Sequence, residues 1–162
     1  MALIFSVLLF LAILLQTNIF PSLLHTNIKP DIFLSLTIYA SLFFESSRGI
    51  VYGFISGMLL DIFSGGAIGS NTFSLMIVGL LAENIKNFVL LENIPAQALL
   101  VTASTLFQWT IAFIYRGTLQ LTLDSILGIT YFLSAQVLLN LVSAFILFFL
   151  LDSLKQKQSL RI

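Results

Sequence analysis

The chain of 162 residues contains no cysteine and a single histidine, His25. Disulfide bonds and thiol chemistry are therefore excluded. A zinc or copper site built from histidine and cysteine side chains of this chain is excluded as well. Charged residues make up only 9% of the sequence, and the formal net charge is zero. This charge balance offers no basic surface for nucleic acid, and no polar stretch is long enough to form a soluble domain.

Hydrophobic residues make up 59% of the chain, which predicts an all-α integral membrane protein. Apolar segments separated by polar turns predict a six-helix transmembrane bundle that forms one domain over residues 1–162. The predicted helices cover residues 2–20, 31–44, 49–63, 71–89, 95–115 and 126–151, and a basic tail follows at 152–162. The first segment lacks a charged start and a cleavage site, so we expect it to be retained as a membrane helix.

The second and third segments have about 14 residues each, fewer than the roughly 20 that cross a hydrocarbon core. They either form a re-entrant pair or cross with their flanking turns just inside the interface. Crossing places both termini on one side together with Arg48, Lys86 and the basic tail, and that side is expected to be the cytoplasm. Only Lys29 and Arg116 then lie outside. A five-crossing topology with an external N-terminus is the alternative.

The most informative segment runs from residue 49 to residue 71 and combines small residues with an acid. Within it, a glycine recurs at every fourth residue and an aspartate follows at the same interval, which places these four residues along one face of a helix. These residues are Gly49, Gly53, Gly57 and Asp61. Glycines at this spacing let a second backbone approach closely inside a membrane. This glycine face is therefore predicted to pack against another helix, either in this chain or in a partner.

Asp61 is the least expected residue of the glycine face. A charged side chain at the centre of a membrane is disfavoured by roughly 2.5–3.5 kcal/mol, and the C-terminal end of a helix also disfavours negative charge. Three roles remain open for its carboxylate. It caps the backbone of the turn at residues 64–66, it anchors its helix to another helix or to a partner by hydrogen bonds, or it transfers a proton or an ion.

The loop from Ser64 to Asn71 is rich in glycine but lacks the lysine of a phosphate-binding loop. It is most simply a tight turn between two helices, with Asn71 as the N-cap of the second. Asp31, which follows Pro30, is expected to be an acid at a helix N-terminus or a polar contact at the outer surface. The complete set of polar contacts expected on the outer side is Asp31, Ser64, Gly65, Gly69 and Asn71.

The sequence contains no recognisable set of catalytic residues. Ser56 has no histidine close to it in the sequence, because His25 lies in a distant loop. Asp61 has no second carboxylate at a matching depth, as aspartyl chemistry requires. We therefore expect no enzymatic activity, no metal ion and no cofactor.

Residues 61–71 resemble a pattern of the MreD family, rod-shape membrane proteins of bacteria. The family commonly has an aspartate, two apolar residues, Ser-Gly, a short turn and then Gly-x-Asn. In this chain these positions are Asp61, Ser64, Gly65, Gly69 and Asn71. Earlier in the chain, the family pattern is also matched by Pro30, Asp31, Gly53 and Gly57. Ala67 stands where the family often has proline, which loosens the turn and leaves the pattern readable.

The resemblance implies a non-enzymatic scaffold of the cell-elongation (rod) complex in the bacterial cytoplasmic (inner) membrane, which helps to maintain cell shape. The partners that it implies are MreC, a single-span protein with a large external domain, and a SEDS glycosyltransferase with its transpeptidase, which carry out peptidoglycan synthesis. The MreB filament is implied as an indirect partner. Membrane lipid surrounds the whole assembly.

The family resemblance also implies a fold similar to that of the substrate-binding subunits of ECF vitamin transporters. An alternative function is therefore a small-molecule binding subunit, with a pocket near Asp31, Asp61 and Asn71. Such subunits dock through an Ala-x-x-x-Ala pattern on the first helix, and here that helix offers only Ala2 and Ser6 at this spacing.

Overall fold

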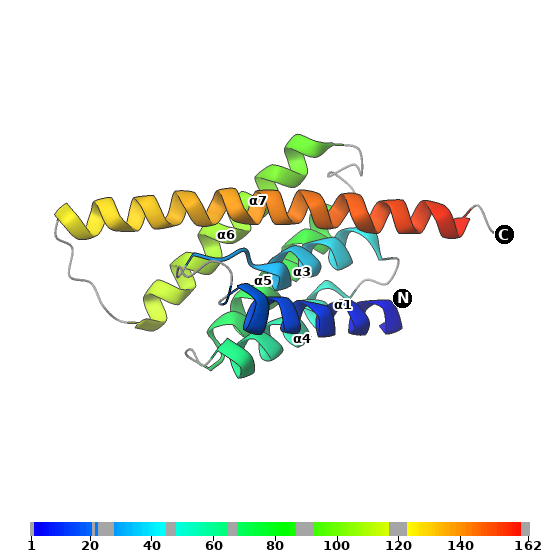
Figure 1. Cartoon of the computed structure of the whole chain (residues 1–162), viewed down its shortest axis with the longest axis horizontal. Coiled ribbons are helices and arrows are strands. Elements are labelled where there is room, and N and C mark those ends of the chain that lie inside the picture. The colour runs from blue at the N-terminus through cyan, green and yellow to red at the C-terminus, as the bar shows by residue number, and fades with distance from the viewer. Residues whose placement is uncertain are drawn as a thin grey trace.

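The computed structural model describes residues 2–20, 22, 28–44, 48–64, 68–86, 93–116 and 123–159. Regular structure in this part of the chain is helical throughout, which confirms the prediction of an all-helical protein for these residues. The elements in chain order are α1 (Ala2–Leu14), the π-helix η1 (Leu15–Ile19), α3 (Ile32–Phe43), α4 (Gly49–Ser64), α5 (Ser70–Ile85), α6 (Ile94–Arg116) and α7 (Leu123–Ser159) (Figure 1).

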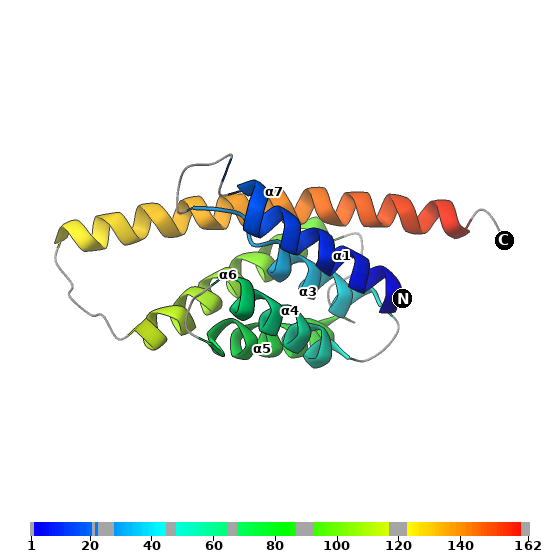
Figure 2. The same ribbon diagram turned by 60° about the horizontal axis from the view of Figure 1, so that its bottom comes forward.

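Helix α3 occupies the centre of the molecule. All 12 of its residues are buried, and it contacts α1, α4, α5, α6 and α7. Figure 2 shows α3 between α7 on one side and the pair of α4 and α5 on the other. Its length of about 18 Å is well below the roughly 30 Å of a hydrocarbon core. Because protein surrounds it on all sides, α3 does not have to match the thickness of a membrane.

Helices α6 and α7 are the two described helices that are long and apolar enough to cross a membrane, whereas α3 and α4 are shorter apolar helices. Helix α7 has 37 residues, which corresponds to about 55 Å, and it extends beyond the other helices in Figure 1. The N-terminal end of α1 and the C-terminal end of α7 lie at the same end of the molecule (Figures 1 and 2).

Aromatic side chains hold the molecule together at the end where the two termini lie. Tyr39 of α3 packs against Phe148 of α7 with ring centroids 5.4 Å apart, and its hydroxyl donates a hydrogen bond to Asp152 at 3.0 Å. Phe5 of α1 packs against Tyr52 of α4 at 4.7 Å. Such ring pairs each add about 0.5–1.5 kcal/mol beyond the area that they bury. Four helices are joined in this way.

Helices α4 and α5 are antiparallel and lie backbone against backbone. The facing positions are Gly49 with Gly79, Gly53 with Leu75 and Gly57 with Thr72. A Cβ atom added to any of these three α4 glycines would overlap backbone atoms of α5, because small residues are what permits so close an approach. In this structure, the glycine face is therefore covered by a helix of the same chain.

Several helix ends differ from those expected. Helix α5 begins at Ser70, with Gly69 rather than Asn71 as its N-cap, because Gly69 adopts the left-handed conformation (φ 95°) that glycine tolerates best. Helix α7 starts at Leu123 and continues through the expected tail to Ser159. Residues 152–159 contain no glycine or proline, and their lysines and glutamines are good helix formers. In the first segment, η1 interrupts the expected single helix.

The contact between α4 and α5 predicts that Gly53→Ala destabilises the protein. Because the added methyl group would overlap the carbonyl group of Leu75, we expect a loss of about 3 kcal/mol in the free energy of unfolding. Thermal unfolding of the purified protein in a mild detergent measures this loss. The control is Gly128→Ala, since nothing lies within 4 Å of a Cβ at this position. Equal unfolding temperatures for the two variants would contradict the packing described.

Candidate functional site

The carboxylate of Asp61 caps the N-terminus of α5. It accepts backbone hydrogen bonds from Gly69 (2.9 Å), Asn71 (3.1 Å) and Thr72 (3.0 Å). The Asn71 side-chain amide and the Thr72 hydroxyl also donate to it, at 2.9 Å and 2.6 Å. Asp61 is only 4% exposed. One buried carboxylate therefore satisfies three of the backbone N–H groups that the start of a helix leaves without partners.

This geometry explains how an acid is accommodated in an apolar segment. Asp61 lies near the C-terminal end of its own helix α4, where the helix dipole disfavours negative charge. Its carboxylate nevertheless contacts the N-terminus of α5, where the dipole favours negative charge. The sequence alone shows only that Asp61 lies near the end of its own helix. That the N-terminus of α5 lies beside it depends on how the loop turns α5 back along α4.

The other end of the α4–α5 pair carries a matching contact. Glu83, in the last turn of α5, accepts a hydrogen bond from the backbone N–H of Gly49 at 2.6 Å. Gly49 is the first residue of α4, so each helix of the pair supplies a carboxylate to the N-terminus of the other. The glycine face lies between these two caps. Close packing and mutual capping thus depend on the same antiparallel register.

Asp31 is the N-cap of the central helix α3. Its Oδ1 accepts a hydrogen bond from the backbone N–H of Leu34 at 3.1 Å, and its residue is 7% exposed. Two further side chains accept hydrogen bonds from backbone N–H groups at the start of α3. Asn140 Oδ1 accepts from the backbone N–H of Asp31 at 2.7 Å, and Gln16 Oε1 accepts from that of Ile32 at 3.3 Å. The start of α3 is thus satisfied from α7 and from η1 as well as by its own cap.

Gln108 of α6 links the two capping acids. Its Nε2 donates to Asp31 Oδ2 at 2.8 Å and makes a longer contact of 3.4 Å with Asn71 Oδ1. Because the amide of Asn71 donates to Asp61, a continuous chain of side chains runs from one acid to the other. Asn140 connects these side chains to α7 through the backbone N–H of Asp31. We call the whole set the cap network, and its members are Asp31, Asp61, Asn71, Gln108 and Asn140.

Further hydrogen bonds attach the cap network to α6 and α7. Asn140 Nδ2 donates to the Thr105 hydroxyl at 3.1 Å, and this hydroxyl donates to the carbonyl of Val101 at 2.8 Å. One turn before Asn140, Gln136 donates to the carbonyl of Lys29 at 2.6 Å. Helices α4, α5, α6 and α7 each contribute one residue to the cap network, and its fifth member, Asp31, caps α3. Gln16 of η1 lies beside the network and accepts a hydrogen bond from Ile32 at the start of α3.

The expected outer polar residues lie at this site in unequal roles. Asp31 and Asn71 belong to the cap network, Gly69 donates its N–H to Asp61, and Ser64 is the last residue of α4. Gly65 lies outside the described residues. Asn71 is not the N-cap that we predicted. It is the second residue of α5, and Asp61 supplies the capping group in its place.

Sequence reasoning missed the amide side chains that complete the site. Gln16, Gln108 and Asn140 are amides in largely apolar segments, and polar side chains in such segments often hydrogen-bond across helices. The signal was therefore present in the sequence. A lone amide does not indicate which helix it contacts, so the sequence could not show that these three residues meet Asp31.

The arrangement holds helices together and leaves little capacity for chemistry. Both carboxylates accept hydrogen bonds from several donors, and a base or nucleophile needs a free lone pair directed at a substrate. Asp31 and Asn71, which the small-molecule alternative places near a pocket, are bridged by Gln108. Within the described residues, no three histidine, cysteine, aspartate or glutamate side chains lie together as a metal site requires.

The capping contact predicts that Asp61→Asn destabilises the protein without changing its volume. An amide NH₂ would face N–H and O–H donors that now meet an oxygen, so we expect a loss of about 3 kcal/mol in the free energy of unfolding. Thermal unfolding in detergent measures it. Asp152→Asn is the matched control, because Asp152 is exposed and an amide oxygen at this position can still accept the hydrogen bond from the Tyr39 hydroxyl. If both variants unfold at the wild-type temperature, Asp61 does not have this role.

The contact between Asp31 and Gln108 is tested by exchanging an acid and an amide. Gln108→Glu places two carboxylates against each other and should lower the amount of folded protein in the membrane. Adding Asp31→Asn restores an amide donor opposite a carboxylate, and asparagine remains a good N-cap. We expect the double variant to unfold at a higher temperature than Gln108→Glu alone. Equal instability of the single and double variants would contradict the direct contact.

The comparisons with known proteins give one match, which covers almost the whole chain. The model of the family described as "rod shape-determining protein MreD" matches residues 1–158. No curated protein and no solved structure matches the chain. The matched region includes the glycine face and all five members of the cap network. The chain therefore belongs to the MreD family, a family of membrane proteins that determine rod shape in bacteria.

Proposed function

We propose that this protein is a non-enzymatic membrane scaffold of the bacterial cell-elongation complex. The observation that carries the proposal is the use of the polar side chains. In a family that determines rod shape, the acid of the characteristic segment, Asp61, binds the N-terminus of helix α5 of this same chain. Their role is to hold the bundle in one arrangement, which is what a binding platform requires.

The proposed topology has six crossings of the cytoplasmic (inner) membrane, with both termini in the cytoplasm. Two features support an even number of crossings and this orientation. The N-terminal end of α1 and the C-terminal end of α7 lie at the same end of the molecule, and the last eleven residues carry Lys155, Lys157 and Arg161, as cytoplasmic segments do. On this topology, the N-termini of α3 and α5 both start from the outer side.

The partner that we propose is MreC, through its single membrane-spanning helix. The glycine face is covered by α5, so the helix of a partner must use an outer surface of the bundle. The side of α4 opposite the glycines presents exposed apolar residues at alternating spacings of four and three, the spacing of a seam between packed helices. These residues are Val51, Ile55, Met58 and Ile62.

This outer seam of α4 has a rigid support. Capping by Glu83 and Asp61 at the two ends of the α4–α5 pair, and backbone packing along its length, fix the orientation of the seam. Docking on a preorganised surface loses less conformational entropy than docking on a mobile one. The complex formed in this way would support peptidoglycan synthesis by the SEDS glycosyltransferase and its transpeptidase, with MreB connected indirectly.

The proposed docking surface is tested by photocrosslinking in growing cells. A photoreactive benzoylphenylalanine at position 58 replaces Met58, which is 49% exposed on the outer seam. We expect a crosslink to MreC that depends on ultraviolet light. The matched control places the same residue at Leu138, which is 62% exposed on α7 and lies outside the seam.

Two results would count against this proposal. A crosslink to MreC from position 138 and none from position 58 would move the docking surface from α4 to α7. The second result concerns cells in which the protein carries Met58→Lys. If these cells keep a normal rod shape and the tagged protein still retains MreC, the seam is not needed for the function.

A further inference from the structure

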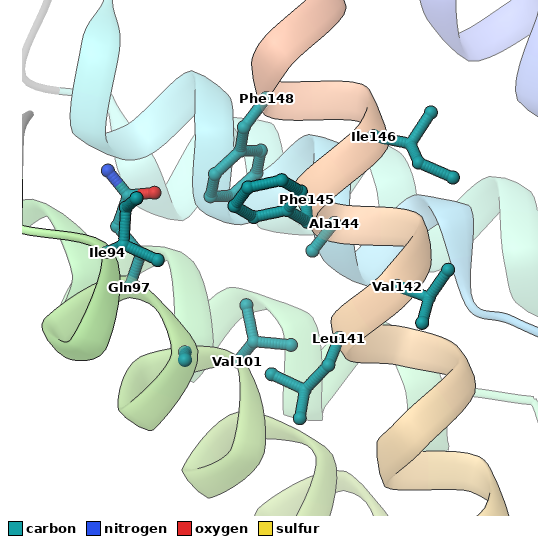
Figure 3. A pocket seen from close by; sticks show the side chains of 10 residues that line it. Ile94, Gln97, Val101, Leu141, Val142, Ala144, Phe145, Ile146 and Phe148 are labelled. Atoms are coloured by element: carbon teal, nitrogen blue, oxygen red, sulfur yellow. The ribbon is translucent and has the colours of Figure 1, made fainter.

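A second feature of the molecule is an apolar crevice between α6 and α7, with a volume of about 350 Å³. Ala98 and Val101 line it from α6, and Leu141, Phe145 and Phe148 line it from α7. Figure 3 shows the two phenylalanine rings side by side, opposite the first turns of α6. The crevice is separate from the cap network, since no member of that network lines it.

The crevice faces the surroundings of the protein and not its core. In the most apolar window of α6 only 22% of the residues are buried within the molecule, and in that of α7 only 17% are. These two helices are the described ones that are long enough to cross a membrane. In a family of membrane proteins, exposed apolar helices of this length face lipid. An empty apolar space in contact with lipid would lose dispersion contacts on one side, so filling it with an apolar chain is favourable.

The size of the crevice favours an acyl chain over a partner helix. An α-helix with side chains is at least about 10 Å wide. A volume of 350 Å³ accordingly holds less than one turn of such a helix. A single methylene chain is narrow enough to lie between Phe145 and Val101 without moving the two helices apart.

The charge distribution along α7 indicates which kind of lipid it is. Helix α7 continues without a break from Phe148 to Ser159 and carries Lys155 and Lys157 in its last turns. These positions lie roughly 10–14 Å beyond Phe148 along the helix axis, where a headgroup lies relative to the upper part of its acyl chain. Lysines at a membrane surface attract anionic lipids. The one acid nearby, Asp152, accepts a hydrogen bond from Tyr39.

We propose that the α6–α7 crevice is a binding site for an anionic phospholipid. One acyl chain lies between the two helices, and the phosphate lies level with Lys155 and Lys157, whose two positive charges outweigh the negative end of the α7 dipole. The phosphate thus belongs to the leaflet that meets the C-terminal end of α7. This site does not depend on the proposed docking of MreC, because that surface belongs to α4.

Fluorescence quenching by brominated lipids tests the site directly. The chain has a single tryptophan, Trp109, so Trp109→Phe removes the background signal. Phe145→Trp then places a reporter in the crevice, and Phe149→Trp places one on the same helix at a residue that is 67% exposed and does not line the crevice. The protein is reconstituted in phosphatidylcholine vesicles that contain brominated phosphatidylglycerol or, for comparison, brominated phosphatidylcholine.

We expect brominated phosphatidylglycerol to quench the reporter at position 145 at about one tenth of the mole fraction that brominated phosphatidylcholine requires. The reporter at position 149 should be quenched equally by both lipids. Equal quenching by both lipids at position 145 would overturn the proposal.

Two further variants separate the roles of the crevice and of the lysines. Ala98→Phe fills the crevice and should abolish the preference at position 145, whereas the exposed Ala103→Phe should preserve it. The double variant Lys155→Ala, Lys157→Ala should lose the preference for the anionic lipid without requiring a change in the packed bundle. If the reporter at position 145 still prefers the anionic lipid after both changes, the proposed site is wrong. It is also wrong if the purified wild-type protein retains a polypeptide in the crevice and no lipid.

Discussion

The rest of the structure depends on hydrogen-bond partners for the backbone N–H groups at helix N-termini that are buried in an apolar bundle. Helices α3, α4 and α5 have 12 to 16 residues, which makes them too short to carry both ends out of a hydrocarbon core of about 30 Å. Backbone N–H groups left unpaired at such a depth are disfavoured by several kcal/mol each. The chain meets this constraint with side chains from neighbouring helices: Asp61 for α5, Glu83 for α4, and Asp31, Gln16 and Asn140 for α3.

The sequence was sufficient to predict helices, their approximate positions and the close-packing face, and insufficient to predict what packs there. Spacing alone placed Gly49, Gly53 and Gly57 on one side of a helix, because the period of an α-helix is fixed. The same spacing is compatible with α5 or with a foreign helix, so the occupant depended on tertiary structure. The extension of α7 through residue 159 was missed because polarity was taken to end a helix, whereas Lys and Gln residues continue one when no glycine or proline intervenes.

Two kinds of surface result from this design, and they differ in what they can recognise. The interior of the bundle is occupied by hydrogen bonds between helices, which give a fixed arrangement and leave no free polar group at Asp61 for a small ligand. The exterior of the described residues is mostly apolar, and its distinctive features are shapes: a seam on α4 and a crevice between α6 and α7. Recognition at such surfaces depends on the fit of apolar groups to one another and on close packing.

The reciprocal caps of α4 and α5 have a consequence for how the protein is made. Residues 49–85 contain both helices, the glycines between them and the acids that satisfy both N-termini. This hairpin needs nothing from later residues to hide its polar backbone from lipid. The contacts that cap both helices are therefore complete before α6 and α7 in the sequence. On a single helix, Asp61 would oppose insertion, whereas in this hairpin its carboxylate is enclosed by the start of α5.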